Sequence, residues 1–293
     1  MRLWILLLPL LVSFNSFAEP LYWLASRPPL QLLITGSVHV GKPSMYPLPS
    51  YISEFLRQSN GLVIETDLNQ ASQVQYPDVT VTSQDVLTAD QQQQLAEIIE
   101  ELQLNRQTLM ASAPWATALA IQIAQMEKQG YFAHYGVDVT LIRQAAQHNV
   151  PRLALEPLQF QIDLLANQPE GNKELLLDVL QEYHFLDQGT ECLIQSWQAG
   201  DLDNLERFRQ LTELSDQFEQ QFIQQRNLDW ARKLASDQLF PENGGQYTVV
   251  VGTLHLIGEN NLIALLEQQG FKVEQRSVSK RAECDFDYSA EPQ

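Results

Sequence analysis

Short apolar runs bounded by turn residues alternate with longer amphipathic stretches along the chain. Runs of this kind are typical of buried strands, and they lie at residues 32–35, 62–65, 152–155, 247–251 and 271–274. Apolar positions at helical spacing predict helices between them, and these helices fill most of the chain from 88 to 239. The pattern predicts an α/β (α+β) fold, with a central mixed sheet and a large helical insertion.

The two ends of the chain carry the same order of strand, loop, helix and strand. Residues 36–40, GSVHV, follow the strand expected at 32–35, and residues 252–256, GTLHL, follow the strand expected at 247–251. Each loop reads Gly, Ser or Thr, an aliphatic residue, His and a second aliphatic residue. One such match is weak, but two in the same setting are much stronger. We therefore interpret the ends as pseudo-repeated β–loop–α–β units that build the central sheet.

The first 18 residues differ from the rest of the chain. Arg2 precedes an apolar run from Leu3 to Val12, and small residues follow at Ser16 and Ala18. This order is typical of a secretory signal peptide, and the apolar run is too short to cross a bilayer comfortably. We predict a signal peptide at 1–18 and export to the periplasm or the medium. The alternative is an uncleaved anchor.

The remainder, residues 19–293, contains no low-complexity linker and is expected to form a single domain. A polar, irregular segment at 70–87 suggests an edge hairpin around Val79 and Val81. No later run is apolar for long enough to span a membrane, so the mature chain is not expected to insert into one.

The charge of the chain argues against two classes of partner. Lys and Arg number 18 against 36 Asp and Glu, which gives a formal net charge of −18 over 293 residues. Binding to nucleic acid needs a basic surface, and docking on anionic lipid needs one too. The balance is compatible with cationic or neutral substrates, although solubility alone would explain it.

The chain has two cysteines, Cys192 and Cys284. In an oxidising compartment an even pair is a candidate disulfide, and two unrelated thiols are an equally weighted alternative. Their separation does not match the spacing of zinc-finger ligands.

The chemistry that the sequence suggests centres on His39 and His255. Ligands of α/β sheets bind beyond the carboxyl ends of the strands, and each histidine follows a predicted strand there. Such a histidine can be a metal ligand or a general base, and Glu65 and Glu156 also end strands. Two histidines with one or two carboxylates have the composition of a hydrolytic metal site. The two units must then pack with their loops at the same sheet edge.

Other candidate residues have ordinary explanations. His134, His148 and His184 have no partner spacing and are expected at the surface or satisfied in the core. Arg226 lies in an amphipathic helix, where an ordinary salt bridge is the default interpretation. Trp230 has apolar neighbours at helical spacing and is more typical of a core than of a ligand site.

The sequence resembles the TraB/PrgY/GumN family in its GumN branch, and more distantly the Tiki proteases and the erythromycin-esterase-like group. The resemblance spans most of the mature chain and depends on short matches: GSVHVG at 36–41 with PLP at 47–49, VIE at 63–65, GVD at 136–138, LE at 155–156 with Gln161, WQAGD at 197–201, RN at 226–227 with Trp230, and GTLHL at 252–256 with Gly258. The chain departs from the family at 157–160, where PLQF replaces acidic residues that are often found there.

The resemblance implies divalent-metal-dependent peptide hydrolysis through two Gly-x-x-His motifs, a Glu and an Arg. Carried over to this chain, His39, His255 and Glu65 hold the metal, which is Mn, Co or Zn. Glu65, Glu156 and Arg226 are the catalytic residues. Glu156 is expected to orient or activate water, and Arg226 to stabilise the developing oxyanion. The expected function is an exported, peptidase-like, metal-dependent hydrolase that acts on a peptide or a small molecule; the alternative is a TraB/PrgY-like protein that binds and sequesters a peptide without cleaving it.

Overall fold

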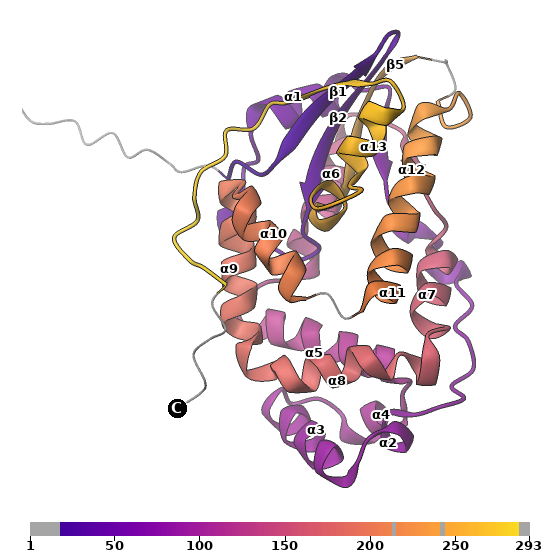
Figure 1. The fold of residues 1–293 in the computed structure, drawn as a ribbon, viewed down its shortest axis with the longest axis vertical. Helices are drawn as coiled ribbons and strands as arrows, with labels where there is room; N and C mark the ends of the chain where they lie inside the picture. The colour runs from indigo at the N-terminus through magenta and orange to yellow at the C-terminus, as the bar shows by residue number, and fades with distance from the viewer. Residues whose placement is uncertain (1–17, 213–214, 241–243, 287–293) are drawn as a thin grey trace, which may run out of the picture.

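The computed structural model describes residues 18–212, 215–240 and 244–286, which form one mixed six-stranded sheet with helices around it (Figure 1). The strand order is β4-β3-β5-β2-β1-β6. β4, β3, β5 and β2 run parallel to one another, whereas β1 runs antiparallel to both of its neighbours. The predicted α/β class with a central mixed sheet is confirmed. The strands span Tyr22–Arg27 (β1), Leu30–Ser37 (β2), Gly61–Ile64 (β3), Arg152–Ala154 (β4), Gly245–Gly252 (β5) and Lys272–Gln275 (β6).

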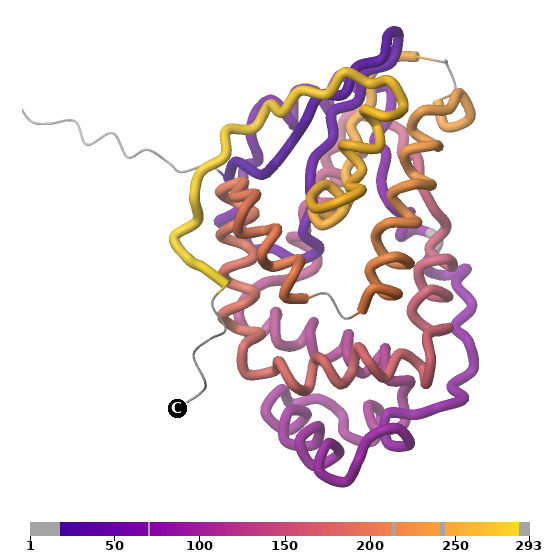
Figure 2. Tube along the Cα trace, in the orientation of Figure 1, coloured from indigo at the N-terminus to yellow at the C-terminus, as the bar shows by residue number. Residues whose placement is uncertain are grey.

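The helices cover both faces of the sheet and build a separate lobe below it (Figure 1). α1 and α6 lie behind the sheet, α12 and α13 lie in front of it, and α2 to α5 and α8 form the lobe. Figure 2 shows that the lobe comes from the middle of the chain, while the first and last parts share the sheet. The helices span Ser50–Gln58 (α1), Ser83–Val86 (α2), Ala89–Glu101 (α3), Arg106–Ala111 (α4), Pro114–Lys128 (α5), Val137–Gln147 (α6), Leu158–Ala166 (α7), Lys173–Glu182 (α8), Leu186–Ala199 (α9), Leu202–Leu211 (α10), Asp216–Glu219 (α11), Gln225–Ala235 (α12) and Leu262–Gln268 (α13).

β2 and β5 lie next to each other in the middle of the sheet. Both strands are buried along nearly their whole length, because helices cover the two faces and the side chains on both are apolar. Their register pairs Ser37 with Gly252, so the two Gly-x-x-His motifs lie side by side with an offset of one residue. The two motif loops therefore leave the sheet at the same edge, as the pseudo-repeat predicts.

Buried apolar side chains form two clusters in the described part of the chain. The larger cluster surrounds the sheet. The smaller one lies inside the lobe, where Leu95, Ile99, Ile121 and Leu176 are all nearly inaccessible to solvent. Within the single domain that the sequence predicts, the lobe thus has a core of its own.

Two strand assignments differ from the sequence pattern. The edge hairpin predicted around Val79 and Val81 is wrong, because the described segment 70–87 contains no strand. Its backbone at Gln75 instead forms two hydrogen bonds of 2.8 and 2.9 Å with the Gln159 side chain. β1 was not predicted, and it forms an antiparallel hairpin with β2 across Pro28 and Pro29.

The structure describes only part of the region around the predicted signal-peptide cut. Residues 1–17, which make up nearly all of the predicted signal peptide, lie outside the described residues. Glu19, the residue after the predicted cut, donates its backbone N–H to the Gln198 carbonyl at 2.7 Å. Among the described helices, none is both long and apolar enough to span a membrane.

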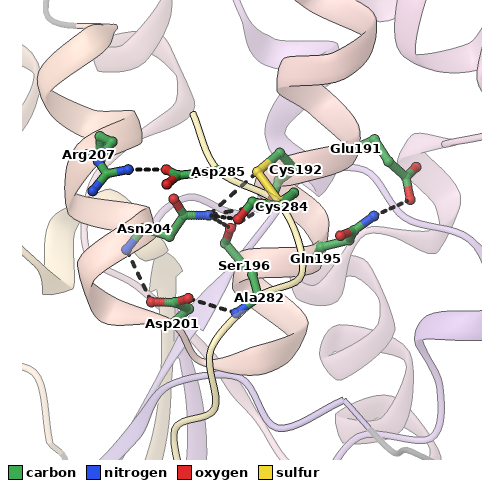
Figure 3. Close-up of a disulfide and its surroundings, with 10 residues drawn as sticks. All are labelled: Glu191, Cys192, Gln195, Ser196, Asp201, Asn204, Arg207, Ala282, Cys284 and Asp285. Carbon is green, nitrogen blue, oxygen red and sulfur yellow. Dashed lines mark hydrogen bonds and ion pairs between the residues drawn. A yellow bond between two sulfur atoms is a disulfide. The ribbon is translucent and has the colours of Figure 1, made fainter. Parts of the chain in front are cut away.

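Cys192 and Cys284 form a disulfide, with their Cα atoms 5.6 Å apart (Figure 3). The bond joins α9 to the segment that follows β6, so one of the two alternatives left open by the sequence is confirmed. Asp201, the N-cap of α10, supports the same attachment by accepting a hydrogen bond of 2.7 Å from the backbone N–H of Ala282. The C-terminal segment is therefore fastened across α9 and α10.

Replacing both cysteines by serine is expected to lower the free energy of unfolding by about 4 kcal/mol, because the bond closes a long loop and its loss frees the unfolded chain. Urea denaturation measures the difference. A reductant should destabilise the wild type to a similar extent and leave the double variant unchanged. Equal stability of the two proteins without reductant would contradict the prediction.

Burial raises the pKa of Asp178 in α8 to about 6, and the neighbouring Glu182 and Glu174 add to the shift. The folded state then binds a proton that the unfolded state releases, so the ionised carboxylate destabilises the fold above about pH 6 and has no effect below about pH 4. We expect Asp178→Asn to raise the free energy of unfolding by about 1–2 kcal/mol at neutral pH, after allowance for solvent screening. Urea denaturation at both pH values checks this.

The same substitution at the exposed Asp203 of α10 is the control, and it should not raise the free energy of unfolding at neutral pH. A gain at Asp178 that persists below about pH 4 would show that the carboxylate charge is not its cause.

Candidate functional site

Four of the side chains predicted from the sequence follow the carboxyl ends of four neighbouring parallel strands. In the order of the sheet, Glu156 follows β4, Glu65 follows β3, His255 follows β5 and His39 follows β2. Arg226 comes to the same edge from the first turn of α12. In α/β sheets this edge is where ligands bind, so the topology alone brings the predicted residues to one region.

The Arg226 guanidinium is the centre of a buried polar cluster, and each of its five N–H groups has an acceptor. Nη2 donates to Glu65 Oε2 at 2.7 Å and to Glu156 Oε1 at 2.8 Å. Nε donates to Glu156 Oε1 at 3.1 Å. Nη1 donates to the Phe222 carbonyl at 2.9 Å and lies 3.1 Å from His255 Nε2. A planar guanidinium is suited to this arrangement, because its donors form a fixed fork.

Arg226 follows an unusual turn in its helix. Residues Gln220–Gln224 form a π-helical turn between α11 and α12, and π turns inside α-helices are frequent at functional sites. The Phe222 carbonyl that accepts from Arg226 belongs to this turn. The side chain is therefore held by its own helix as well as by the carboxylates opposite it.

Glu156 is 5% exposed, and its two oxygens accept hydrogen bonds from three side chains on two helices, α7 and α12. The Trp230 indole N–H donates to Oε2 at 2.9 Å, and the Gln161 amide donates to Oε1 at 2.9 Å. Gln161 also donates to Glu65 at 3.3 Å, so it bridges both carboxylates. Trp230 is fully buried, as the sequence predicts. Its ring also lies 4.6 Å from the Arg226 Cζ, a cation–π distance.

Sequence reasoning assigned no role in the site to Trp230 or Gln161. The signal for Trp230 was its position four residues after Arg226, because residues at this spacing share one face of a helix. The sequence indicates a role for Gln161 less clearly, because the residue stands out only through the family resemblance.

The glycine of each motif lies where a Cβ atom would crowd a neighbouring side chain. Gly252 donates its backbone N–H to Glu65 Oε1 at 2.6 Å, and a Cβ at this position would lie 3.2 Å from the same oxygen. A Cβ at Gly36 would lie 2.6 Å from the Thr253 hydroxyl of the second motif. Burial on its own would raise the pKa of Glu65, but His255, Arg226 and the Gly252 amide outweigh it and hold the pKa below its usual range.

His255 is 4% exposed and lies in a 3₁₀ turn, Thr253–Leu256, directly after β5. Its Nδ1 lies 2.8 Å from the Asn227 side-chain oxygen. Burial lowers the pKa of His255 to about 3, while Glu65 opposes the shift and Arg226 adds to it. The imidazole is therefore neutral near pH 7, the form that a metal ligand or a proton acceptor needs.

His39 lies in a different environment, although its motif is the same. Its side chain is 70% exposed, and Nδ1 lies 3.6 Å from a carboxylate oxygen of Asp138 in α6. Contact with Asp138 raises the pKa of His39 above its usual range and favours the charged ring. His134, His148 and His184 are exposed, in agreement with the sequence.

These residues are of types that bind metal ions, but their positions in the structure do not form a metal site. Neutral His255 and ionised Glu65 are suitable ligands, but Nε2 of the first and Oε2 of the second both contact Arg226. Across the residues that the structure describes, no three His, Cys, Asp or Glu side chains are grouped to hold a metal. In this conformation the guanidinium takes the place of a shared cation, and the residues do not form a metal site.

A cavity of about 350 Å³ leads to the cluster. Its volume is in the range of small-ligand sites, and its lining is Glu156, Pro157, Phe160, Gln225, Arg226, Asp229 and Lys233. A larger cavity of about 510 Å³ lies beside the disulfide. Arg207 and Asp285 in its lining pair with each other, so the smaller cavity is the better candidate for chemistry.

Replacing Arg226 by leucine is expected to lower the free energy of unfolding by about 3–5 kcal/mol, because Glu65 and Glu156 stay buried without a counter-charge. Adding Glu65→Gln and Glu156→Gln should recover part of the loss, since neutral amides need no cation. Thermal and urea denaturation measure both effects.

Arg207→Leu is the matched control, because it removes a guanidinium from an exposed ion pair. It should cost less than about 1 kcal/mol. Equal losses for the two arginines would mean that the Arg226 cluster is no more than an ordinary surface salt bridge.

Comparison with known proteins gives a consistent set of relatives. Residues 21–275 match the TraB/PrgY/gumN family, and this range includes all five predicted site residues. The chain is 29% identical over 235 residues to "Uncharacterized protein YbaP" of Escherichia coli (strain K12) and, to the same extent, to the protein of that name from Shigella flexneri. Each match covers 80% of this chain and 86% of the relative. No solved structure matches the chain.

Proposed function

We propose, from the premise that the chain belongs to the TraB/PrgY/gumN family, that it is an exported hydrolase of peptides with its active site at the Arg226 cluster. One observation carries the proposal. Two carboxylates, a guanidinium and a neutral imidazole converge at the carboxyl ends of parallel strands, beside a cavity that reaches Glu156 and Arg226. Clusters of paired, strongly shifted groups in a cleft are typical of catalytic sites.

In the proposed reaction, a substrate carbonyl enters the cavity beside Arg226. One N–H of the guanidinium exchanges an internal acceptor for the carbonyl oxygen and stabilises the negative charge that develops there. Glu156 accepts a proton from the attacking water, and the same proton then passes to the leaving amine as the C–N bond breaks. Gln161 and Trp230 keep the Glu156 carboxylate in place during these steps.

The cavity walls suit an uncharged substrate side chain. Pro157 and the half-exposed Phe160 form an apolar side. Asp229 and Lys233 on the opposite helix neutralise each other across 2.6 Å. A charged side chain would therefore find no free partner among the described lining residues of this cavity.

A divalent metal is part of the proposal as a cofactor, held by His39, His255 and Glu65. When bound, such an ion acts as a Lewis acid and lowers the pKa of a water molecule. Because these residues do not form a metal site in the described conformation, Arg226 must first leave His255 and Glu65. None of the steps above depends on the ion.

The export part of the proposal is supported by two observations. The sequence predicts a signal peptide at 1–18, and the structure contains a disulfide, which is stable in an oxidising compartment such as the periplasm.

A specific observation favours the second candidate, a protein that binds and sequesters a peptide without cleaving it. All five N–H groups of Arg226 are used inside the cluster. A guanidinium in this state holds the site together without acting on a substrate.

The two candidates differ in turnover. The mature protein is incubated with a mixture of synthetic peptides, with Mn²⁺, Co²⁺ or Zn²⁺ or with a chelator, and the products are identified by mass spectrometry. We expect cleavage by the wild type and a loss of about 10²-fold or more in Glu156→Gln, because the proton acceptor is gone. His184→Ala, which changes an exposed histidine outside the cluster, should match the wild type.

Peptides that are retained but never cleaved would overturn the hydrolase and support the binding protein. Cleavage that is unaffected by the chelator, in protein shown to be metal-free by mass spectrometry, would overturn the metal cofactor alone.

A further inference from the structure

His255 contacts two groups whose hydrogen-bonding roles are known. Arg226 Nη1 lies 3.1 Å from Nε2, and a guanidinium can only donate. Nε2 must therefore carry the lone pair. In a neutral imidazole the proton is then on Nδ1, which lies 2.8 Å from the side-chain oxygen of Asn227.

The orientation of the Asn227 amide is fixed as well. An asparagine amide can be placed in two ways, and only its partners distinguish them. The nitrogen Nδ2 lies 3.2 Å from the carbonyl oxygen of Asn260, which can only accept. The amide oxygen must then face the histidine. Asn227 is fully buried, so bulk water cannot serve as another partner.

The Asn260 carbonyl belongs to a turn in which two residues have left-handed backbone conformations. Asn260 has a φ of 53°, and Gly258 two residues earlier has a φ of 76°. Asparagine and glycine are the residues that adopt this left-handed region most readily. The loop after the second motif thus anchors the amide that contacts the histidine of that motif.

We propose that Asn227 is a positioning residue that holds His255 as its Nδ1–H tautomer, with the Nε2 lone pair directed at the Glu65–Arg226 pair. The hydrogen bonds run in one direction from Arg226 through the imidazole and the Asn227 amide to the Asn260 carbonyl. His255 can then accept a proton or hold a cation at Nε2, but it cannot donate a proton from that nitrogen. This role deepens the proposed function, and its contribution to turnover rests on that function.

The first motif has a looser counterpart at its exposed histidine. The Nδ1 atom of His39 lies near a carboxylate oxygen of Asp138, at 3.6 Å. In both motifs an oxygen from a different helix faces Nδ1, but the charged ring that Asp138 favours carries a proton on both nitrogens, so only His255 has a free lone pair at Nε2. Oxygen partners of this kind fix the tautomer and the ring orientation of functional histidines.

Long-range ¹H–¹⁵N correlation spectra of the mature protein, with assigned histidine rings, test the proposal directly. The wild type is expected to show His255 with a protonated Nδ1 and an unprotonated Nε2. A wild-type spectrum with the proton on Nε2 would overturn the proposal without any variant.

Asn227→Leu removes the acceptor, and a second tautomer of His255 is expected to appear. Turnover should fall by about 10- to 100-fold, because His255 then no longer accepts from Arg226 in a fixed orientation and the guanidinium loses one of the contacts that position it. Asn227→Asp keeps an oxygen at the same position. It should retain the Nδ1–H signature and most of the turnover that Asn227→Leu loses. An Asn227→Leu protein with the wild-type spectrum would overturn the proposal.

Asn204→Leu is the matched control, because Asn204 is also a buried asparagine on a helix but donates to Ser196 beside the disulfide (Figure 3). It should leave the His255 spectrum unchanged. An equal change in this control would mean general loosening of the core and would also overturn the proposal. If the wild type proves to have no hydrolytic activity, the spectra still decide the tautomer, so failure of the function and failure of this inference are separable.

Discussion

The buried positive charge of Arg226 is the interaction on which the rest of the site depends. An ionised carboxylate is costly to bury alone, and the segments after β3 and β4 each supply one. A single guanidinium neutralises both and reaches His255 at the same time. The contact also fixes α12 on the sheet, together with Lys233, which donates to the Leu155 carbonyl at 2.6 Å. The same contacts therefore neutralise the two buried carboxylates and hold α12 on the sheet.

The elements that depend on local pattern could be predicted from the sequence. β2 and β5 are continuous apolar runs, and their equivalent motifs correctly indicated that the loops meet at one edge. β1 could not be recognised, because its state depends on pairing with β2. The predicted hairpin around Val79 and Val81 is wrong because the segment has strand propensity but no partner strand to pair with. The nearby Pro77 also lacks a backbone donor for a sheet hydrogen bond.

The members of the candidate site could be named from the sequence, but their contacts could not. The hydrogen bond between Gly252 and Glu65 joins residues 187 positions apart, so no local signal encodes it. The two motifs also look alike in sequence, yet His255 is buried and His39 is exposed. The difference arises because Trp230 and Asn227 of α12 pack against the first, whereas the second lies over the start of α6. A motif specifies the residue type at a strand end, and the elements packed around it determine its state.

The strand order has a consequence for when the candidate site is assembled. β5 lies between β2 and β3, although it is made long after both of them. The Thr253 hydroxyl meets the Ser37 carbonyl across 216 positions of sequence, and such distant contacts form slowly because much chain must first be ordered. A growing chain that stops short of β5 has a sheet without its central strand and a cluster without its imidazole. The candidate site is therefore incomplete throughout synthesis, and it assembles only when the last part of the chain has folded.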